Sequence, residues 1–360
     1  MLIVQTPPSG LAAPEPLPKV YNRGGTVVVR MPNHLGDAVM ALPAIKQLRE
    51  SFSRVAVIAA TRPVIELLAN VPDIDDILAL ARAHSRWRQN DRDALAAFNA
   101  DCGILFNNSL RDAWNFWLSG VKNRYGASAR WRAILLTEAF KLPRTSCGRL
   151  TGAHHARIYS ALAESVGAAP WSGKFPKFNF SPASEPQPRL LAVAPGAAYG
   201  DAKRWPSSRF KSVIANYLDA YPDATAVILG SEAERAIGNE VIAGLAAERV
   251  QNLCGRTSIS ELATLLRTAS ACLANDSGIM HLAAALGAPG VAVFGSTDYT
   301  STAPVSTRWK VIYSEMPCAP CFSRNCPKGY APDCMNAIDE ATVSTELIGL
   351  NTIGVPETEI

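Results

Sequence analysis

The sequence lacks a hydrophobic run long enough to cross a membrane as a helix. Its longest weakly polar stretch, residues 281–295, contains glycine and proline, whereas a membrane span needs about 20 apolar residues. Residues 1–19 also lack a basic segment ahead of an apolar core, so we do not expect a signal peptide. Their richness in proline and small residues predicts a disordered tail over 1–24. We therefore expect a cytoplasmic protein.

An excess of charge of one sign is also missing. The formal net charge is only +4 over 360 residues, which argues against a nucleic acid as the partner. Basic residues do gather locally, at Arg124, Arg130 and Arg132. This grouping in the amino-terminal half indicates a patch that binds an anionic ligand.

Two nucleotide-binding fingerprints are absent from the loops that follow the predicted strands. None of these loops contains G-x-G-x-x-G, and none contains G-x-x-x-x-G-K-[ST]. Hydride transfer from a dinucleotide and P-loop chemistry are therefore disfavoured.

What the chain does have is a pattern of apolar runs and helical periods that occurs twice. The first half has predicted strands and helices at 25–30, 37–50, 54–59, 63–70 and 102–106. The second half has them at 190–194, 208–219, 225–229, 260–268, 271–275 and 290–294, with Ser258 or Ser260 capping the helix at 260. Strands that alternate with helices form parallel sheets covered on both faces.

This pattern predicts an α/β protein of two Rossmann-like domains. We place the domains at 25–174 and 189–345, a linker rich in proline, serine and lysine at 175–188, and a second tail at 346–360. Ligands of such sheets bind at the carboxyl ends of the strands. The loops that follow the strands are therefore the candidate sites.

The first candidate loop ends in Asp37, which follows Gly36 near the start of a predicted helix. One interpretation is that Asp37 only caps this helix, as aspartate often does. The other is that its carboxylate faces the ligand as a general base. The residue types leave both open.

The second and third candidate loops lie in the carboxyl-terminal half. The loop at 195–206 contains glycines, Lys203 and Arg204, which suit a diphosphate, although a solvated basic turn is the alternative. The third loop, 275–278, enters a helix whose backbone amides can bind phosphate. Asp276 would be repelled by phosphate and is expected to meet sugar hydroxyls. His281 in the same helix fits a structural role as well as a catalytic one.

Taken together, these motifs resemble those of the lipopolysaccharide heptosyltransferases, which form glycosyltransferase family nine. The resemblance runs from about residue 26 to 343. It rests on Leu-Gly-Asp at 35–37, Pro-Gly-Ala at 195–197, Ala-Lys-Arg-Trp-Pro at 202–206, Gly-Arg-Thr-Ser-Ile-Ser-Glu-Leu at 255–262, Asn-Asp-Ser-Gly at 275–278, His281, Phe-Gly-Ser-Thr at 294–297 and the late cysteines.

The resemblance implies a GT-B fold, ADP-heptose as the donor, inversion at the anomeric carbon and no required cofactor. The implied acceptor is a lipid A–Kdo core that already bears one heptose. Asp37 falls on the family's base. The donor contacts implied by the resemblance are Lys203, Arg204, Glu234, Thr257, Asp276, Ser277, Gly278 and His281. Asn33 and His34 depart from the serines that relatives often carry there.

The acceptor side is expected in the amino-terminal half, where Arg124, Arg130 and Arg132 would meet the phosphorylated lipid. The segment 114–118 adds Trp114, Phe116 and Trp117. These aromatic residues fit a hydrophobic core, or a peripheral contact with the inner face of the inner membrane.

A compact set of four cysteines stands near the end, at Cys318, Cys321, Cys326 and Cys334. Cysteines close in sequence can hold a structural zinc ion, although the spacing is not that of a standard zinc finger. In the cytoplasm the alternative is four free thiols.

Two further functions stay open on sequence grounds. A sugar-nucleotide epimerase can share the same two-domain architecture, because a fold does not determine a reaction. A metal-cluster protein that binds nucleic acid is the alternative from another class, and the modest net charge speaks against it.

Overall fold

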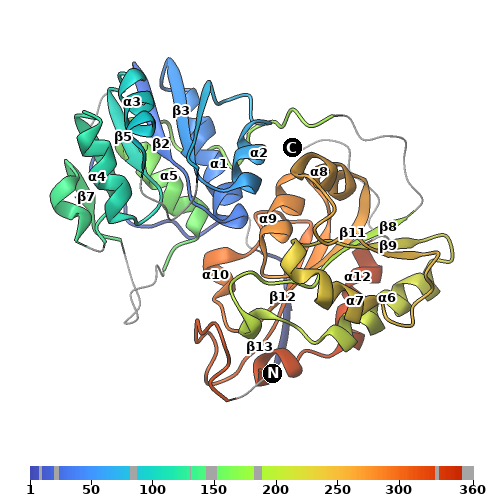
Figure 1. Ribbon diagram of the computed structural model, residues 1–360. Coiled ribbons are helices and arrows are strands. Elements are labelled where there is room, and N and C mark those ends of the chain that lie inside the picture. Colours follow the sequence, from blue (N-terminus) through green and yellow to red (C-terminus); the bar gives the residue numbers. More distant parts are fainter. Residues whose placement is uncertain are drawn as a thin grey trace. The chain divides into compact units, whose positions relative to one another are not determined.

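The computed structural model describes residues 1–7, 10–19, 24–81, 87–129, 131–142, 152–181, 189–328 and 332–350. The chain divides into two compact units (Figure 1). The amino-terminal unit spans Leu11–Asn179, and the carboxyl-terminal unit combines Met1–Gly10 with Phe180–Ile360. Within the described part, no helix is both long and apolar enough to cross a membrane.

The amino-terminal unit is built on a parallel sheet with the strand order β4-β3-β2-β5-β6-β7. Its central strands are almost entirely buried, which explains why they appear in the sequence as continuous apolar runs. The strands are β2 (Thr26–Arg30), β3 (Arg54–Ala59), β4 (Asp76–Ala79), β5 (Cys102–Leu105), β6 (Asn123–Ala127) and β7 (Glu138–Phe140).

Helices cover this sheet and supply its core. They are α1 (Leu35–Arg49), α2 (Arg62–Leu68), α3 (Gln89–Ala97), α4 (Leu110–Leu118), the short 3-10 helix η1 (Arg132–Leu135) and α5 (His155–Ser165). α1 packs against α5, and α4 contacts both α3 and η1. Leu95 of α3 and Phe116 of α4 are completely buried in one cluster with residues of the sheet.

The carboxyl-terminal unit has a seven-stranded sheet with the order β1-β13-β12-β11-β8-β9-β10. All its strand pairs are parallel except that of β1 with β13. The strands are β1 (Leu2–Gln5), β8 (Leu190–Ala194), β9 (Thr225–Ile228), β10 (Val250–Asn252), β11 (Ala269–Asn275), β12 (Gly290–Phe294) and β13 (Trp309–Ser314).

Helices lie on both faces of this second sheet (Figure 1). They are η2 (Asp201–Lys203), α6 (Ser207–Ala220), η3 (Glu232–Glu234), α7 (Arg235–Ile242), α8 (Ile259–Thr268), α9 (Gly278–Ala285), α10 (Tyr299–Thr302), α11 (Asp333–Asn336) and α12 (Glu340–Gly349). α6 and α12 pack together over the core. Ser258 caps α8 through its hydroxyl, which confirms one of the two predicted caps. The two parallel sheets confirm the predicted α/β fold of two Rossmann-like units.

The predicted tails need correction at both ends. Residues 1–24 are not simply a disordered tail, because β1 pairs with β13 from Leu2↔Ser314 to Gln5↔Val311. Leu2 and Val4 pack against the core of the carboxyl-terminal unit, and this packing stabilises the pairing of β1 with β13. The second tail was placed from residue 346, but α12 continues to Gly349 and buries Leu347 completely.

Candidate active site

Three loops at the carboxyl ends of neighbouring strands form the centre of the carboxyl-terminal unit. β8 leads into 195–206, β11 leads into residues 276–277, and β12 leads into 295–298. β11 lies between β8 and β12, parallel to both. The three strand ends therefore meet at one edge of the sheet, which is where ligands of such sheets bind.

An ion pair joins two of these loops. The ammonium Nζ of Lys203 lies 2.5 Å from the carboxylate Oδ2 of Asp276, and the two side chains are only 13% and 6% exposed. The hydroxyl of Thr297, from the loop 295–298, donates to the same oxygen at 2.7 Å. Each of the three loops thus contributes one polar group to a single cluster.

Electrostatics keeps this buried carboxylate ionised. Burial by itself would raise the pKa of Asp276, but the positive charge of Lys203, the neighbouring His281 and the two hydrogen bonds outweigh burial. The pKa of Asp276 is consequently held below its usual range. The stable state of the site is therefore a charged pair.

Asn275, the residue before Asp276, fixes the second loop to the end of β11. It is completely buried. Its amide nitrogen donates to the carbonyl of Pro195 at 2.6 Å, and its amide oxygen accepts from the backbone N–H of Trp205 at 3.2 Å. One side chain thereby holds both ends of the loop that carries Lys203.

Glu234 also faces the second loop. A Cβ atom added to Gly196 would lie 1.9 Å from the Oε1 atom of Glu234, so a larger residue there would displace the Glu234 carboxylate. The other carboxylate oxygen of Glu234 accepts 2.7 Å hydrogen bonds from the backbone and the hydroxyl of Ser231. The structure therefore brings Glu234 to the loop that carries Lys203.

The remaining predicted donor residues occupy different surroundings. Ser277 caps α9 by accepting from the backbone of Met280, and Gly278 begins that helix. His281 is 5% exposed on the same helix. Thr257 lies in the segment between β10 and α8. Arg204 pairs with Asp201 at 2.7 Å, so its charge already has a carboxylate partner.

A cavity of about 450 Å³ opens beside Thr297 at the ends of β12 and β13. Tyr299 and Tyr313 both line it, and their rings stack with centroids 4.5 Å apart. Burial and the hydrogen bond with Tyr299 raise the pKa of Tyr313 to about 12, so this phenol stays neutral. Sequence reasoning missed the cavity, because its lining combines residues 295–299 with the end of β13 and the segment that follows it, and their proximity depends on the order of the strands.

The four cysteines face a second, small cavity that Ala202 and Ser296 also line. In the part of the chain that the structure describes, no three or more potential ligands are arranged to hold a metal ion. Burial raises the pKa of Cys334 to about 11. A structural zinc at Cys318, Cys321, Cys326 and Cys334 therefore stays a prediction.

The cysteine segment is nevertheless joined to the donor loops. The backbone N–H of Ala202 donates to the carbonyl of Arg324 at 2.9 Å. The backbone N–H of Phe322 donates to the carbonyl of Ser296 at 2.7 Å. Because Ala202 precedes Lys203 and Ser296 precedes Thr297, this segment supports two of the three loops.

In the amino-terminal unit, Asp37 lies in the first turn of α1. The N-cap residue of α1 is His34, so Asp37 is not the cap residue that the alternative interpretation required. Its Oδ1 atom lies 3.6 Å from Nδ1 of His155 on α5, and the two side chains are 31% and 25% exposed. Burial and the nearby Asp37 charge raise the pKa of Tyr159. Sequence reasoning missed His155, which is 118 positions away from Asp37 along the chain.

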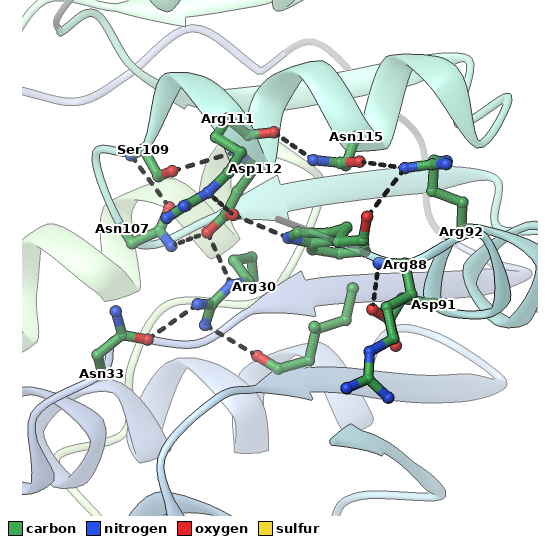
Figure 2. A network of polar contacts seen from close by, with 12 residues as sticks. Arg30, Asn33, Arg88, Asp91, Arg92, Asn107, Ser109, Arg111, Asp112 and Asn115 are labelled. Atoms are coloured by element: carbon green, nitrogen blue, oxygen red, sulfur yellow. Dashed lines mark hydrogen bonds and ion pairs between the residues drawn. The ribbon is translucent and has the colours of Figure 1, made fainter. Parts of the chain in front are cut away.

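Beneath the first loop lies a buried ion pair between Arg30 and Asp112 (Figure 2). Arg30 ends β2, is completely buried, and donates to Asp112 at 2.9 Å. It also donates to the side-chain oxygen of Asn33 at 2.8 Å. Relatives often carry serine at this position. Here the side chain of Asn33 accepts a hydrogen bond from Arg30, which gives asparagine a structural role in this chain.

One of the predicted acceptor arginines needs correction. Arg132 is completely buried and donates to the carbonyls of Ala127 and Asn107, so it braces the main chain and is inaccessible to a ligand. Arg124 is half-buried and donates to the carbonyls of residues 121, 122 and 135. Its contact with the acceptor stays a prediction. Arg130 lies outside the described residues.

Comparison with solved structures supports the fold. Escherichia coli ADP-heptose LPS heptosyltransferase II matches with a TM-score of 0.73 and 24% identity, covering 91% of this chain and 98% of that one. A family 9 glycosyltransferase from Veillonella parvula matches with a TM-score of 0.74 and 18% identity, covering 93% and 98%. The fold is therefore that of the GT-B heptosyltransferases.

Sequence comparison points to the same group. The chain is 26% identical over 308 residues to lipopolysaccharide heptosyltransferase 2 of E. coli, which covers 79% of this chain and 87% of that protein. The family model for glycosyltransferase family 9 (heptosyltransferase) matches residues 90–331. These matches favour a glycosyltransferase over an epimerase or a nucleic-acid-binding protein. The chain belongs to glycosyltransferase family 9, the heptosyltransferases.

Proposed function

We propose that this protein transfers heptose from ADP-heptose to the inner core of lipopolysaccharide, where it adds the second heptose. The observation that carries this proposal is the cluster of Lys203, Asp276 and Thr297 at the carboxyl ends of three parallel strands. The relatives named lipopolysaccharide heptosyltransferase 2 and ADP-heptose LPS heptosyltransferase II support this donor and acceptor.

Lys203 is proposed to stabilise the diphosphate as it leaves. An ammonium group has three donor hydrogens, and Asp276 receives one of them. Asp276 then holds the ammonium in place while the remaining hydrogens bind phosphate oxygens. The backbone amides at the start of α9 add further donors. Fixed positive charge of this kind can take the place of a metal ion at the leaving group.

Asp37 is proposed as the general base that removes the proton from the acceptor hydroxyl. A positioned base contributes about 10²–10⁴-fold to such a reaction. Asp37 follows the carboxyl end of β2 and is partly exposed. His155 at 3.6 Å would orient the carboxylate. Attack by this hydroxyl on the face opposite the diphosphate gives inversion at the anomeric carbon.

The acceptor is proposed to be lipid A–Kdo bearing one heptose, and the reaction is placed in the cytoplasm. Because the lipid portion of this acceptor is embedded in a membrane, the enzyme has to reach the cytoplasmic face of the inner membrane.

The test is a turnover assay with purified protein, ADP-heptose and heptosyl-Kdo-lipid A. We expect ADP to be released only when the acceptor is present, and the product lipid to gain the mass of one heptose. Release of ADP that does not depend on the acceptor would contradict the proposal. So would transfer that occurs only to an acceptor lacking the first heptose. A change of the sugar nucleotide without ADP release would favour an epimerase.

A further inference from the structure

The helix α4 turns four of its apolar side chains outward. Trp114, Trp117 and Leu118 are each 48% exposed, and Leu110 is 42% exposed. Leu110, Trp114 and Leu118 follow one another at intervals of four residues, and Trp117 lies three residues after Trp114, so they share one side of the helix. The opposite side of α4 buries the apolar Ala113 and Phe116 completely, together with two polar side chains, Asp112 (2% exposed) and Asn115 (4% exposed). The helix therefore buries two polar groups while four large apolar side chains stay half exposed.

Buried polar contacts hold α4 in this orientation (Figure 2). Asp112 accepts from Arg30 at 2.9 Å, from the indole of Trp87 at 3.1 Å and from Asn107 at 2.6 Å. Rolling the helix to bury its tryptophans would separate Asp112 from Arg30 and leave a buried guanidinium without its carboxylate. The outward position of the tryptophans is therefore a fixed property of the fold.

A second element adjoining α4 also exposes large apolar groups. The 3-10 helix η1 contacts α4. Trp131, just before it, is 90% exposed, and Ile134 within it is 88% exposed. Arg132, between them, is buried and anchors the element to carbonyl groups. Apart from Met1, the large exposed apolar residues of the described chain all belong to these two elements, and we call them the apolar face: Leu110, Trp114, Trp117, Leu118, Trp131 and Ile134.

Between residues 110 and 142, the stretch that carries the apolar face, the exposed charges are mainly positive. Arg111 on α4 keeps 36% of its side chain exposed, and Lys122 and Lys141 are exposed. Of the acidic residues between 110 and 142, Asp112 is buried in its ion pair and only Glu138 is exposed. A surface that combines tryptophan with basic residues is complementary to anionic lipid headgroups over an apolar interior.

We infer that the apolar face docks this protein onto the surface of an anionic lipid bilayer. The inference rests on the proposed function, because an enzyme whose acceptor is embedded in a membrane has to bind at the surface of that membrane. Tryptophan rings settle at the level of the headgroups, and the neighbouring cations bind the acidic lipids. The contact is peripheral, since α4 has only nine residues and a span needs about 20.

The experiment measures co-sedimentation of the full chain with vesicles. One set contains phosphatidylglycerol and phosphatidylethanolamine, and a second set contains phosphatidylcholine alone. We expect binding to the first set that weakens with salt. The variant W114A/W117A should bind these vesicles at least about tenfold more weakly, because each tryptophan buries a large apolar area on docking.

The matched control is Trp171→Ala, which removes a tryptophan of the same unit whose indole donates to the carbonyl of Lys174. This variant should bind vesicles like the unchanged protein. The melting temperature of W114A/W117A should change little, since about half of each tryptophan is exposed to solvent. If that variant fails to fold, quenching of wild-type tryptophan fluorescence by brominated lipid gives the same information.

Three outcomes would overturn the inference. They are no binding of the wild-type protein to anionic vesicles, equal binding by W114A/W117A, or a dimer of the wild-type protein that W114A/W117A disrupts and Trp171→Ala does not. Turnover separates this inference from the proposed function. With acceptor dispersed in detergent, W114A/W117A should turn over like the wild type, whereas with acceptor in vesicles it should be slower. Inactivity of the wild type in both assays would instead contradict the proposed function.

Discussion

The Nζ atom of Lys203 lies 2.5 Å from the Oδ2 atom of Asp276, and these two residues come from loops that are 73 positions apart in the sequence. Both side chains are largely buried. A residue expected to bind the donor diphosphate therefore also neutralises a buried carboxylate. This double role decides how substitutions at either position have to be interpreted.

Lys203→Ala should weaken ADP binding and also destabilise the protein. Loss of a charge-assisted contact costs about 1.5–3 kcal/mol of binding free energy. Removing one partner of a buried ion pair costs about 3–5 kcal/mol of folding free energy, because the other charge stays buried without compensation. Titration calorimetry with ADP and thermal unfolding measure the two effects.

The double variant K203A/D276N separates these two roles. It should recover much of the lost stability, since no uncompensated charge remains, while ADP affinity stays low. Lys211→Ala, on α6 of the same unit, is the matched control for loss of a lysine. If K203A/D276N bound ADP with wild-type affinity, Lys203 would not be part of the donor site.

The carboxyl-terminal unit should lose stability in acid through Asp276. Its pKa is below the ordinary value of 3.8 in the folded state. A depressed carboxylate pKa stabilises the fold above the unfolded-state pKa, and this stabilisation is lost as the pH falls through the folded pKa. Melting temperatures measured from pH 7 down to about pH 2.5 should therefore fall less steeply below pH 3.8 in Asp276→Asn than in the wild type. The exposed Asp223, changed to Asn, should leave the slope unchanged.

Much of the fold could be predicted because buried parallel strands consist of continuous apolar runs. β8 and β12 match their predicted bounds, 190–194 and 290–294. β1 was missed because its partner, β13, lies about 300 residues further along the chain. A four-residue strand beside a proline-rich segment gives little local signal.

The site was harder to predict than the fold. Loop motifs identified Lys203 and Asp276 separately, but their ion pair depends on strand order. Residue type suggested that Arg132 binds a ligand, whereas burial shows that it braces the main chain. The aromatic residues at 114–118 fitted either a core or a membrane contact, and residue type could not show that Trp114 and Trp117 are half exposed whereas Phe116 is buried.

The zinc prediction for the cysteines can be tested by elemental analysis of protein purified under reducing conditions. It requires about one zinc ion per chain at a four-thiol site. Chelation should then lower the melting temperature of the wild type but not that of C318S/C321S. No zinc, together with all eight cysteines open to alkylation after unfolding, would reject it. Turnover should persist under chelation, since Lys203 and the amides of α9 are proposed to supply the positive charge.

Asp112→Asn should destabilise the amino-terminal unit. It leaves Arg30 charged, completely buried and without its carboxylate, at a cost of about 3–5 kcal/mol. Chemical denaturation measures the loss. Asp93→Asn on the exposed face of α3 is the control, since Asp93 only accepts a bond from Gln89 there. An unchanged unfolding free energy in Asp112→Asn would mean that the network of Figure 2 does not hold α4 in place.

Asp37→Asn should abolish most turnover while leaving the fold intact. The acceptor hydroxyl has a pKa far above neutrality, so its attack gains from proton removal, and loss of a positioned base should cost at least about a hundredfold. Asparagine keeps the shape of the side chain and its place in the first turn of α1. ADP affinity and melting temperature should therefore change little. His155→Gln should have a smaller effect on turnover, because His155 at 3.6 Å orients Asp37 and does not itself accept the proton. Turnover near the wild-type rate in Asp37→Asn, or unfolding of the amino-terminal unit, would show that Asp37 serves the helix and that another group is the base.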